Sequence, residues 1–178
     1  MNSQQNRTCK WEAPKERKLN VDATIFEITG ERWLGAGFVV RNVSGEVELA
    51  GTRRMLIGQT MEEVELAALV WSLCCCQREN IMIKEIDMDC KVVVDWIKGR
   101  HLSGILGHIV EDYLNLMVSI NCDASLHCPR EGNEVTHLLA KRAKDMSEEI
   151  MAWFDLSHML DDIQLVIIRE ASSSFEGG

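Results

Sequence analysis

The chain has 178 residues, which suits a single domain with short extensions. Its hydrophobic share of 46% can form a core, yet no apolar run is long enough to span a membrane. The formal charge of −9 argues against tight binding to nucleic acid through its phosphates. The first residues are polar and lack the apolar stretch of a secretory signal. We therefore expect an intracellular protein, in the nucleus or cytoplasm, without a membrane partner.

The cysteines do not form a ligand pattern. There are seven of them, an odd number, and no C-x-x-C pair occurs. Cys74, Cys75 and Cys76 are contiguous, a spacing that disfavours both ring closure and a tetrahedral zinc site. We expect reduced cysteines that act as small apolar residues, with no assigned role for the Cys74–Cys76 run.

The first strand is the informative one. Residues 1–16 form a polar lead-in, in which Trp11 and Pro14 are the expected contacts. From Lys18 to Ile25 apolar and polar residues alternate, which is typical of a strand with one buried face. Asp22 is unusual within such a run. Either this is an edge strand with Asp22 in water, or it is a central strand that holds one carboxylate in a site.

Two further strands follow closely. Trp33–Val40 is the second, where Gly35 and Gly37 indicate a close backbone approach or a bulge. Glu46–Met55 is the third. Three strands joined by short turns predict an antiparallel meander.

A helix then begins at a capping box, with Thr60 as N-cap and Glu63 at the third helical position. The buried stripe expected on it comprises Val64, Ala67, Ala68, Trp71 and Cys75. Glu65 lies beside this stripe. From the helix alone, Glu65 is a surface acid that compensates the helix dipole.

The second half alternates strands and helices. Ile81–Asp89 is the fourth strand, which the strand–helix–strand order predicts to be parallel to an earlier one. Helices are expected over 92–97 and 105–118, a fifth strand over Ala124–Cys128, and a last helix that Asn133 caps. Beyond residue 150 we expect a short helix around 153–160, an extended piece over 165–168, and disorder over 171–178.

Three acids have suggestive places in this order. Asp22 lies within the first strand, Glu65 near the start of the first helix, and Asp89 at the end of the fourth strand. Carboxylates that converge repel one another unless hard cations neutralise them, and Mg²⁺ prefers oxygen ligands. Two such ions can hydrolyse a phosphodiester.

Six segments, in this order and spacing, carry a resemblance to a known family: Trp11–Pro14, Lys18–Asp22, Ala36–Asn42, Val64–Ala68, Asp87–Asp95 and Arg130–Lys141. They resemble the ribonuclease H type 1 superfamily, and more closely the ribonuclease H-like domains of plant retrotransposon-derived proteins. The resemblance implies an α/β fold with a five-stranded mixed sheet, in the order β-β-β-α-β-α-α-β-α. It places the domain at 17–147 and a C-terminal extension at 148–178.

The resemblance also implies a site. Asp22, Glu65 and Asp89 match the acids that bind two Mg²⁺ or Mn²⁺ ions and cleave the RNA strand of an RNA–DNA hybrid. Glu65 is the match because it directly precedes the Leu-Ala-Ala run, and Asp89 because the Cys-Lys-Val-Val-Val segment follows it.

Two positions depart from the family pattern. Ala23 stands where the family usually has glycine, and His137 stands where a fourth acid begins the last helix. A histidine can ligate a metal or relay a proton, but it lacks the negative charge of aspartate. We therefore expect weaker binding of the second ion and reduced activity, with His137 as a partial substitute or a plain surface residue.

Two functions remain open from the sequence. The first is a metal-dependent nuclease that binds RNA–DNA hybrid or RNA weakly, as an expected monomer. The second is a catalytically silent, domesticated module for protein or nucleic-acid interaction. A calcium site is disfavoured because no Asp-x-Asp-x-Asp-Gly loop occurs.

Overall fold

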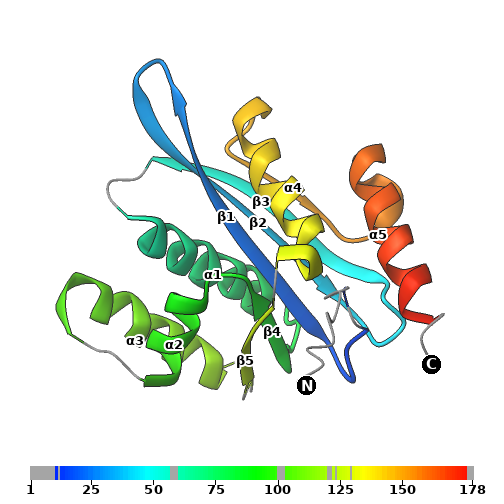
Figure 1. Ribbon diagram of the computed structural model, residues 1–178, viewed down its shortest axis with the longest axis horizontal. Coiled ribbons are helices and arrows are strands. Elements are labelled where there is room, and N and C mark those ends of the chain that lie inside the picture. The colour runs from blue at the N-terminus through cyan, green and yellow to red at the C-terminus, as the bar shows by residue number, and fades with distance from the viewer. Residues whose placement is uncertain are drawn as a thin grey trace, which may run out of the picture.

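The structure is a computed structural model that describes residues 11, 13–56, 60–99, 103–119, 122, 124–128 and 130–175 (Figure 1). The expected lead-in therefore lies mostly outside the described residues, as do 176–178. The strands are β1 (Lys18–Ile28), β2 (Glu31–Arg41), β3 (Val47–Leu56), β4 (Glu85–Met88), β5 (Ala124–His127) and β6 (Ile150–Trp153). The α-helices are α1 (Met61–Arg78), α2 (Lys91–Gly99), α3 (Gly104–Ser119), α4 (Glu134–Arg142) and α5 (Asp161–Phe175), with 3₁₀ turns η1 (Arg130–Gly132), η2 (Ala143–Asp145) and η3 (Leu156–His158).

One mixed sheet organises these elements, in the spatial order β5-β4-β1-β2-β3-β6. The first three strands form the predicted antiparallel meander, while β4 pairs parallel to β1 and β5 pairs parallel to β4. The expected fold class is confirmed in its first five strands, and β6 adds a sixth at the edge beside β3. Because β1 lies between β4 and β2, the edge-strand interpretation of Asp22 is wrong.

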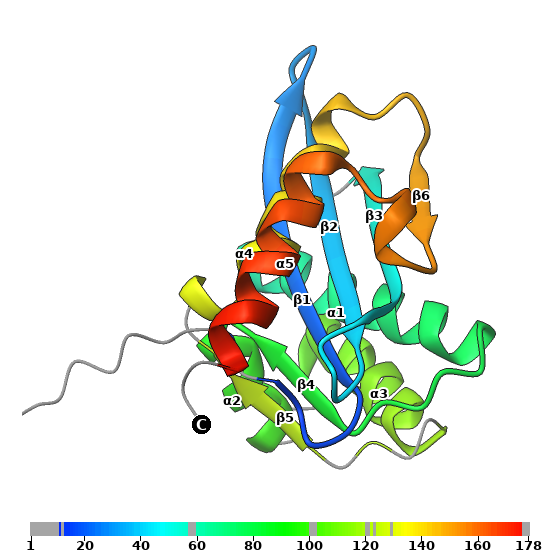
Figure 2. The ribbon, with the colours of Figure 1, turned by 90° about the vertical axis from the view of Figure 1, so that its right-hand side faces the viewer.

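Helices cover both faces of the sheet. Helix α1 packs on the face formed by Leu19, Val21 and Ala23, all nearly inaccessible to solvent. Helices α4 and α5 lie together on the opposite face, where Val39 joins a second, smaller core (Figures 1 and 2). The alternation along β2 thus contributes residues to both cores, one on each side of the sheet, whereas the buried apolar residues of β1 belong to the first core.

The glycines of β2 bring α4 close to the sheet. A Cβ atom at Gly35 would lie 2.2 Å from the carbonyl oxygen of Ala140, and one at Gly37 would lie 2.4 Å from that of Thr136. Any side chain at these two positions would therefore push the helix away. The expected close backbone approach at Gly35 and Gly37 is confirmed. The irregularity in the pairing of β2 with β3 lies elsewhere, between Val40 and Arg41.

The start of α1 follows the predicted capping box. The Glu63 amide donates to Thr60 Oγ1 at 3.3 Å, and the Thr60 amide donates to Glu63 Oε2 at 3.0 Å. The stripe of apolar residues faces the core, although Ala67 is only partly buried. Glu65 is 3% exposed, so the interpretation of it as a surface acid is wrong.

The C-terminal part differs from the expectations. Of the short helix expected around 153–160, only the 3₁₀ turn η3 forms, and Trp153 ends strand β6. The expected extended piece over 165–168 is helical, and the expected disorder over 171–178 is wrong for 171–175, which belong to α5. The residues of α5 buried in the second core are Ile163, Val166 and Ile167, which recur at helical spacing. The apolar run 165–168 therefore belongs to a helix with one buried face.

A buried ion pair attaches α5 to the sheet. Arg41 Nη1 lies 2.7 Å from Glu170 Oε2, and the Arg41 guanidinium lies 4.4 Å from the centre of the Trp11 ring. Pro14 is buried as well, so both expected contacts of the lead-in are confirmed. Within the described part of the chain, no helix is both long and apolar enough to cross a membrane.

Candidate metal centre

Asp22 and Asp89 lie where two neighbouring strands part. The parallel pairing of β1 with β4 runs from Lys18 opposite Glu85 to Val21 opposite Met88. Asp22 follows Val21 directly in the sequence, and Asp89 follows Met88. The ladder therefore ends directly before both acids, which are neighbours just beyond its last paired residues.

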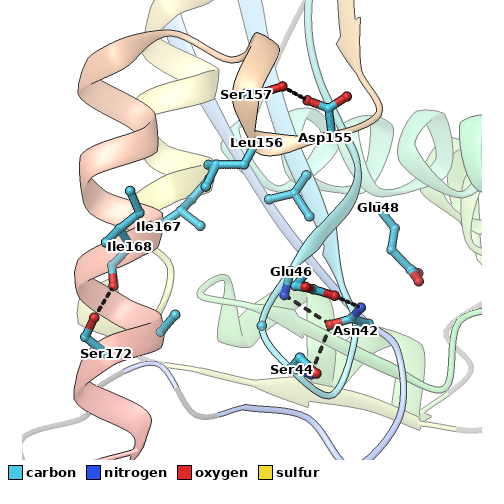
Figure 3. A pocket seen from close by; sticks show the side chains of 13 residues that line it. Asn42, Ser44, Glu46, Glu48, Asp155, Leu156, Ser157, Ile167, Ile168 and Ser172 are labelled. Carbon is cyan, nitrogen blue, oxygen red and sulfur yellow. Dashed lines mark hydrogen bonds between the residues drawn. The ribbon is translucent and has the colours of Figure 1, made fainter.

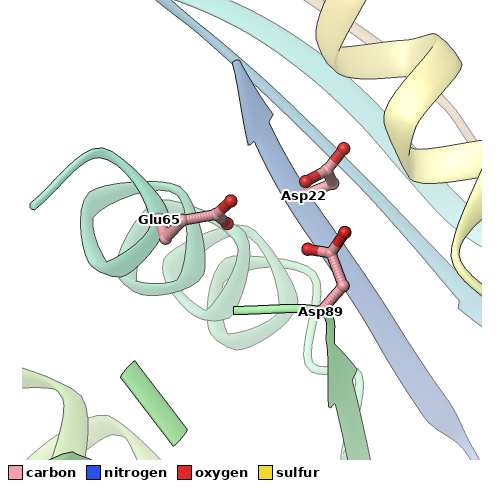
Figure 4. A group of neighbouring side chains, drawn as sticks. All are labelled: Asp22, Glu65 and Asp89. Carbon is pink, nitrogen blue, oxygen red and sulfur yellow. The ribbon is translucent and has the colours of Figure 1, made fainter. Parts of the chain in front are cut away.

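Glu65 approaches these two acids from α1. Its carboxylate points toward those of Asp22 and Asp89, so three elements contribute one acid each (Figure 4). One oxygen of each side chain lies within 4.8 Å of the corresponding oxygens of the other two. The sequence interpretation required such proximity, because carboxylates farther apart could not share a cation.

Burial makes this cluster costly without a counter-ion. Asp22 is 1% exposed, and burial together with the Asp89 charge raises its pKa to about 6, although His137 acts in the opposite direction. Burial and then the charges of Asp22 and Asp89 raise the pKa of Glu65 to about 9. The Glu65 carboxyl group therefore keeps its proton at neutral pH unless a cation takes the place of that proton.

The donor set fits a hard divalent cation. All three ligands offer oxygen atoms, which Mg²⁺ and Mn²⁺ accept. Glu65 Oε2 is buried and finds no hydrogen-bond donor among the described residues. A buried acceptor of this kind is expensive when unsatisfied, and a bound cation would satisfy it.

His137 contacts the cluster from α4. His137 Nδ1 lies 2.8 Å from Asp22 Oδ2, and the His137 side chain is 21% exposed. The close packing of α4 over Gly37, the partner of Asp22 across β1 and β2, produces this contact. On the other side, Arg130 Nε lies 3.5 Å from Asp89 Oδ2.

The neighbouring acids lie outside the cluster. Lys18 Nζ lies 2.9 Å from Asp87 Oδ2, and this pair holds β1 to β4. Glu63 belongs to the capping box. The structure therefore brings together Asp22, Glu65, Asp89 and His137, as the sequence interpretation required, while their catalytic roles stay a prediction.

Asn133 has a role that sequence reasoning missed. It stands at the N-cap position of α4 but makes no capping bond with its side chain. Its Nδ2 instead donates to the carbonyl oxygen of Val21 at 2.7 Å, and its Oδ1 accepts from Asn20 Nδ2 at 3.3 Å. Asn133 is 2% exposed and thus ties α4 to β1 beside Asp22. No local pattern distinguishes this role from a cap.

The fold and the acidic cluster define a class of protein. The profile of the family described as reverse transcriptase-like matches residues 20–143, which is most of the chain. The chain belongs to this family, and its fold is of the ribonuclease H type.

Solved structures agree on the fold. Ribonuclease H1 from the archaeon Halobacterium salinarum is 18% identical, with a TM-score of 0.63 over 73% of this chain and 98% of its own. LC11 ribonuclease H1, isolated from compost and solved with an RNA/DNA hybrid, is also 18% identical, with a TM-score of 0.63 over 73% of this chain and 97% of its own. The N-terminal ribonuclease H domain of a Mycobacterium tuberculosis protein is 22% identical, with a TM-score of 0.59 over 72% of this chain and 94% of its own. No curated protein sequence matches the chain.

Proposed function

We propose that this protein is a metal-dependent endonuclease that hydrolyses the RNA strand of RNA–DNA hybrids. The observation that carries the proposal is the convergence of Asp22, Glu65 and Asp89 to within 4.8 Å at the end of the β1–β4 ladder. Such a buried acidic cluster is destabilising in itself, and a fold retains it most readily for chemistry. Mg²⁺ is the proposed ion, with Mn²⁺ as an alternative.

Asp22, Glu65 and Asp89 would hold the ions. When bound, a pair of divalent ions activates water and stabilises the leaving oxygen of a phosphodiester. The chain itself supplies a rigid frame, because Asp22 lies in β1, Glu65 lies in α1 and Asp89 directly follows β4. Asn133 supports this frame by fixing α4 against β1 beside Asp22.

The substrate class rests on the fold and on one relative, since LC11 ribonuclease H1 is described in complex with an RNA/DNA hybrid. The charge of −9 weakens any phosphate contact. We therefore expect weak substrate binding that decreases further as the salt concentration rises.

A second candidate is a catalytically silent module. The observation that favours it is the contact of His137 Nδ1 with Asp22 Oδ2, which occupies one carboxylate oxygen of Asp22. In this case the acidic cluster would keep its protons, and the fold would act as an interaction domain.

The two functions differ in one assay. The purified chain is incubated with an RNA–DNA hybrid labelled on the RNA strand, with Mg²⁺, with Mn²⁺ or with a chelator. Cleavage of the RNA strand that requires metal supports the nuclease. If Asp22→Asn cleaves equally well, the activity comes from a contaminant, and if no metal supports cleavage by the wild-type chain, the silent module is favoured.

A further inference from the structure

A groove of about 720 Å³ lies on α5, away from the acidic cluster. One wall is the turn between β2 and β3, and the other walls are η3 and the second half of α5 (Figure 3). No residue of the candidate metal centre lines it. Its far wall, residues 155–172, lies beyond the segment that the family profile matches.

The walls of this α5 groove are fixed before any ligand arrives. Asn42 Oδ1 accepts from the amides of Ser44 and Glu46, both at 3.0 Å, and so holds the β2–β3 turn. Asp155 Oδ1 accepts from the His158 amide at 3.2 Å and holds η3. The Arg41–Glu170 pair holds α5. A preformed groove binds at a lower entropic cost than a mobile one.

The groove has an apolar floor and an acidic rim. Val47, Leu156 and Ile167 form the floor. Glu46, Glu48 and Asp155 line the rim, and no lysine, arginine or histidine is among the described lining residues. Glu48 pairs with Arg17 and Asp155 with His158, whereas the Glu46 carboxylate accepts from the neutral amide of Asn42 at 2.9 Å. The rim is therefore acidic overall.

The apolar surface continues along α5 beyond the groove. Ile168 lines the groove and is 50% exposed, and Leu165, one turn earlier, is 69% exposed. Exposed apolar side chains next to a rim of one charge sign are a feature of protein interaction sites. A peptide covers such a strip better than a small molecule does.

We propose that the α5 groove binds a short segment of a partner protein that combines lysine or arginine with large apolar side chains. The apolar side chains would occupy the floor beside Leu156 and Ile168, and the cations would meet Glu46 and Asp155. A second copy of the chain is a poor occupant because it carries −9 and the same acids. Nucleic acid is repelled by the same rim. This proposal does not depend on the nuclease function.

The test begins with selection of short random peptides displayed on phage against the full-length chain. The most enriched peptide is then synthesised with a fluorophore, and its affinity is measured by fluorescence anisotropy. We expect enriched peptides to carry net positive charge and large apolar residues. Failure to enrich any peptide, or enrichment of neutral or acidic peptides, would overturn the proposal.

Matched variants locate the binding site. Ile168→Ser and Glu46→Lys should each weaken the peptide by about tenfold or more, because they remove an apolar contact and reverse a rim charge. The controls Val118→Ser and Glu111→Lys alter an exposed apolar residue and an exposed acid on α3 and should change the affinity by less than about twofold. Circular dichroism confirms that each variant is folded. Equal affinity for groove and control variants contradicts the proposal, as does a wild-type dimer that Ile168→Ser dissociates in sedimentation, which would assign the groove to a second copy.

Discussion

Asp22 combines the strongest structural constraints of any residue in the cluster. It is buried in a central strand, faces two other acids and contacts His137 at 2.8 Å. Its raised pKa of about 6 means that its charge is disfavoured in the metal-free protein. A residue that lowers stability in this way is expected to be retained for function rather than for folding.

Neutralising Asp22 should therefore separate activity from stability. We expect Asp22→Asn to abolish hybrid cleavage and, in chelator at about pH 8, to leave the free energy of unfolding unchanged or raise it by up to about 3 kcal/mol, since one pKa unit corresponds to about 1.4 kcal/mol. Denaturant titration measures this free energy. The control Asp95→Asn breaks the exposed pair of Asp95 with Lys91, so it should leave cleavage unchanged and lower the free energy of unfolding by about 0.5 kcal/mol or less. A variant that melts well below wild type would instead make Asp22 a structural hydrogen-bonding residue.

His137 offers a second residue-scale prediction. His137→Asp should raise Mg²⁺-supported cleavage, because it adds an oxygen ligand beside Asp22, and Mg²⁺ prefers oxygen to nitrogen. His137→Ala should lower cleavage, and the wild type should prefer Mn²⁺. Initial rates with each metal test this, with the exposed His108→Ala as control. Identical rates and metal preference in all four proteins would show that His137 takes no part.

At the scale of elements, local signals predicted most of the chain as far as residue 145. The capping box located α1, and alternation located β1, because both signals arise within a few neighbouring residues. The fourth strand is shorter than expected, since only Glu85–Met88 pair with β1. The sequence does not predict strand β6, because it pairs with β3 between residues about a hundred positions apart, a contact that no local pattern encodes.

The attachment of α5 gives an element-scale prediction. Glu170→Ala should cost about 3–5 kcal/mol of unfolding free energy, because it leaves the buried Arg41 charge without its partner. Glu134→Ala is the control, since it breaks the exposed Glu134–Arg169 pair and should cost about 1 kcal/mol or less. Denaturant titration of both variants decides the matter. Equal losses would mean that the buried pair does not anchor α5.

At the scale of the whole molecule, the sequence predicted the acids but not the support around them. Asp22, Glu65 and Asp89 were recognisable from their places in the order of strands and helices. The burial of Glu65 and the bond of Asn133 to Val21 were not, because both depend on how α1 and α4 approach the sheet from opposite faces. Tertiary packing therefore decides which acids become a cluster.

This cluster predicts how the stability of the metal-free chain depends on pH. The pKa values of Asp22 and Glu65 are raised in the folded state, to about 6 and about 9, so the folded state binds more protons than the unfolded state above about pH 4. Stability should therefore fall as pH rises from about 5 to about 9 in chelator. Thermal unfolding across this range measures the trend. Glu65→Gln should flatten it, and a wild-type stability that rises throughout the range would contradict the assigned pKa shifts.

Calorimetric titration of Mn²⁺ into the full-length chain tests the metal centre most directly. At about pH 7.5 we expect saturable binding with release of protons, because the cation must displace the proton that Glu65 holds, and the measured heat should therefore vary with the ionisation enthalpy of the buffer. Glu65→Gln and Asp22→Asn should weaken or abolish this binding. If Mn²⁺ does not bind, or binds both variants as tightly as the wild type, Asp22, Glu65 and Asp89 do not form a metal centre.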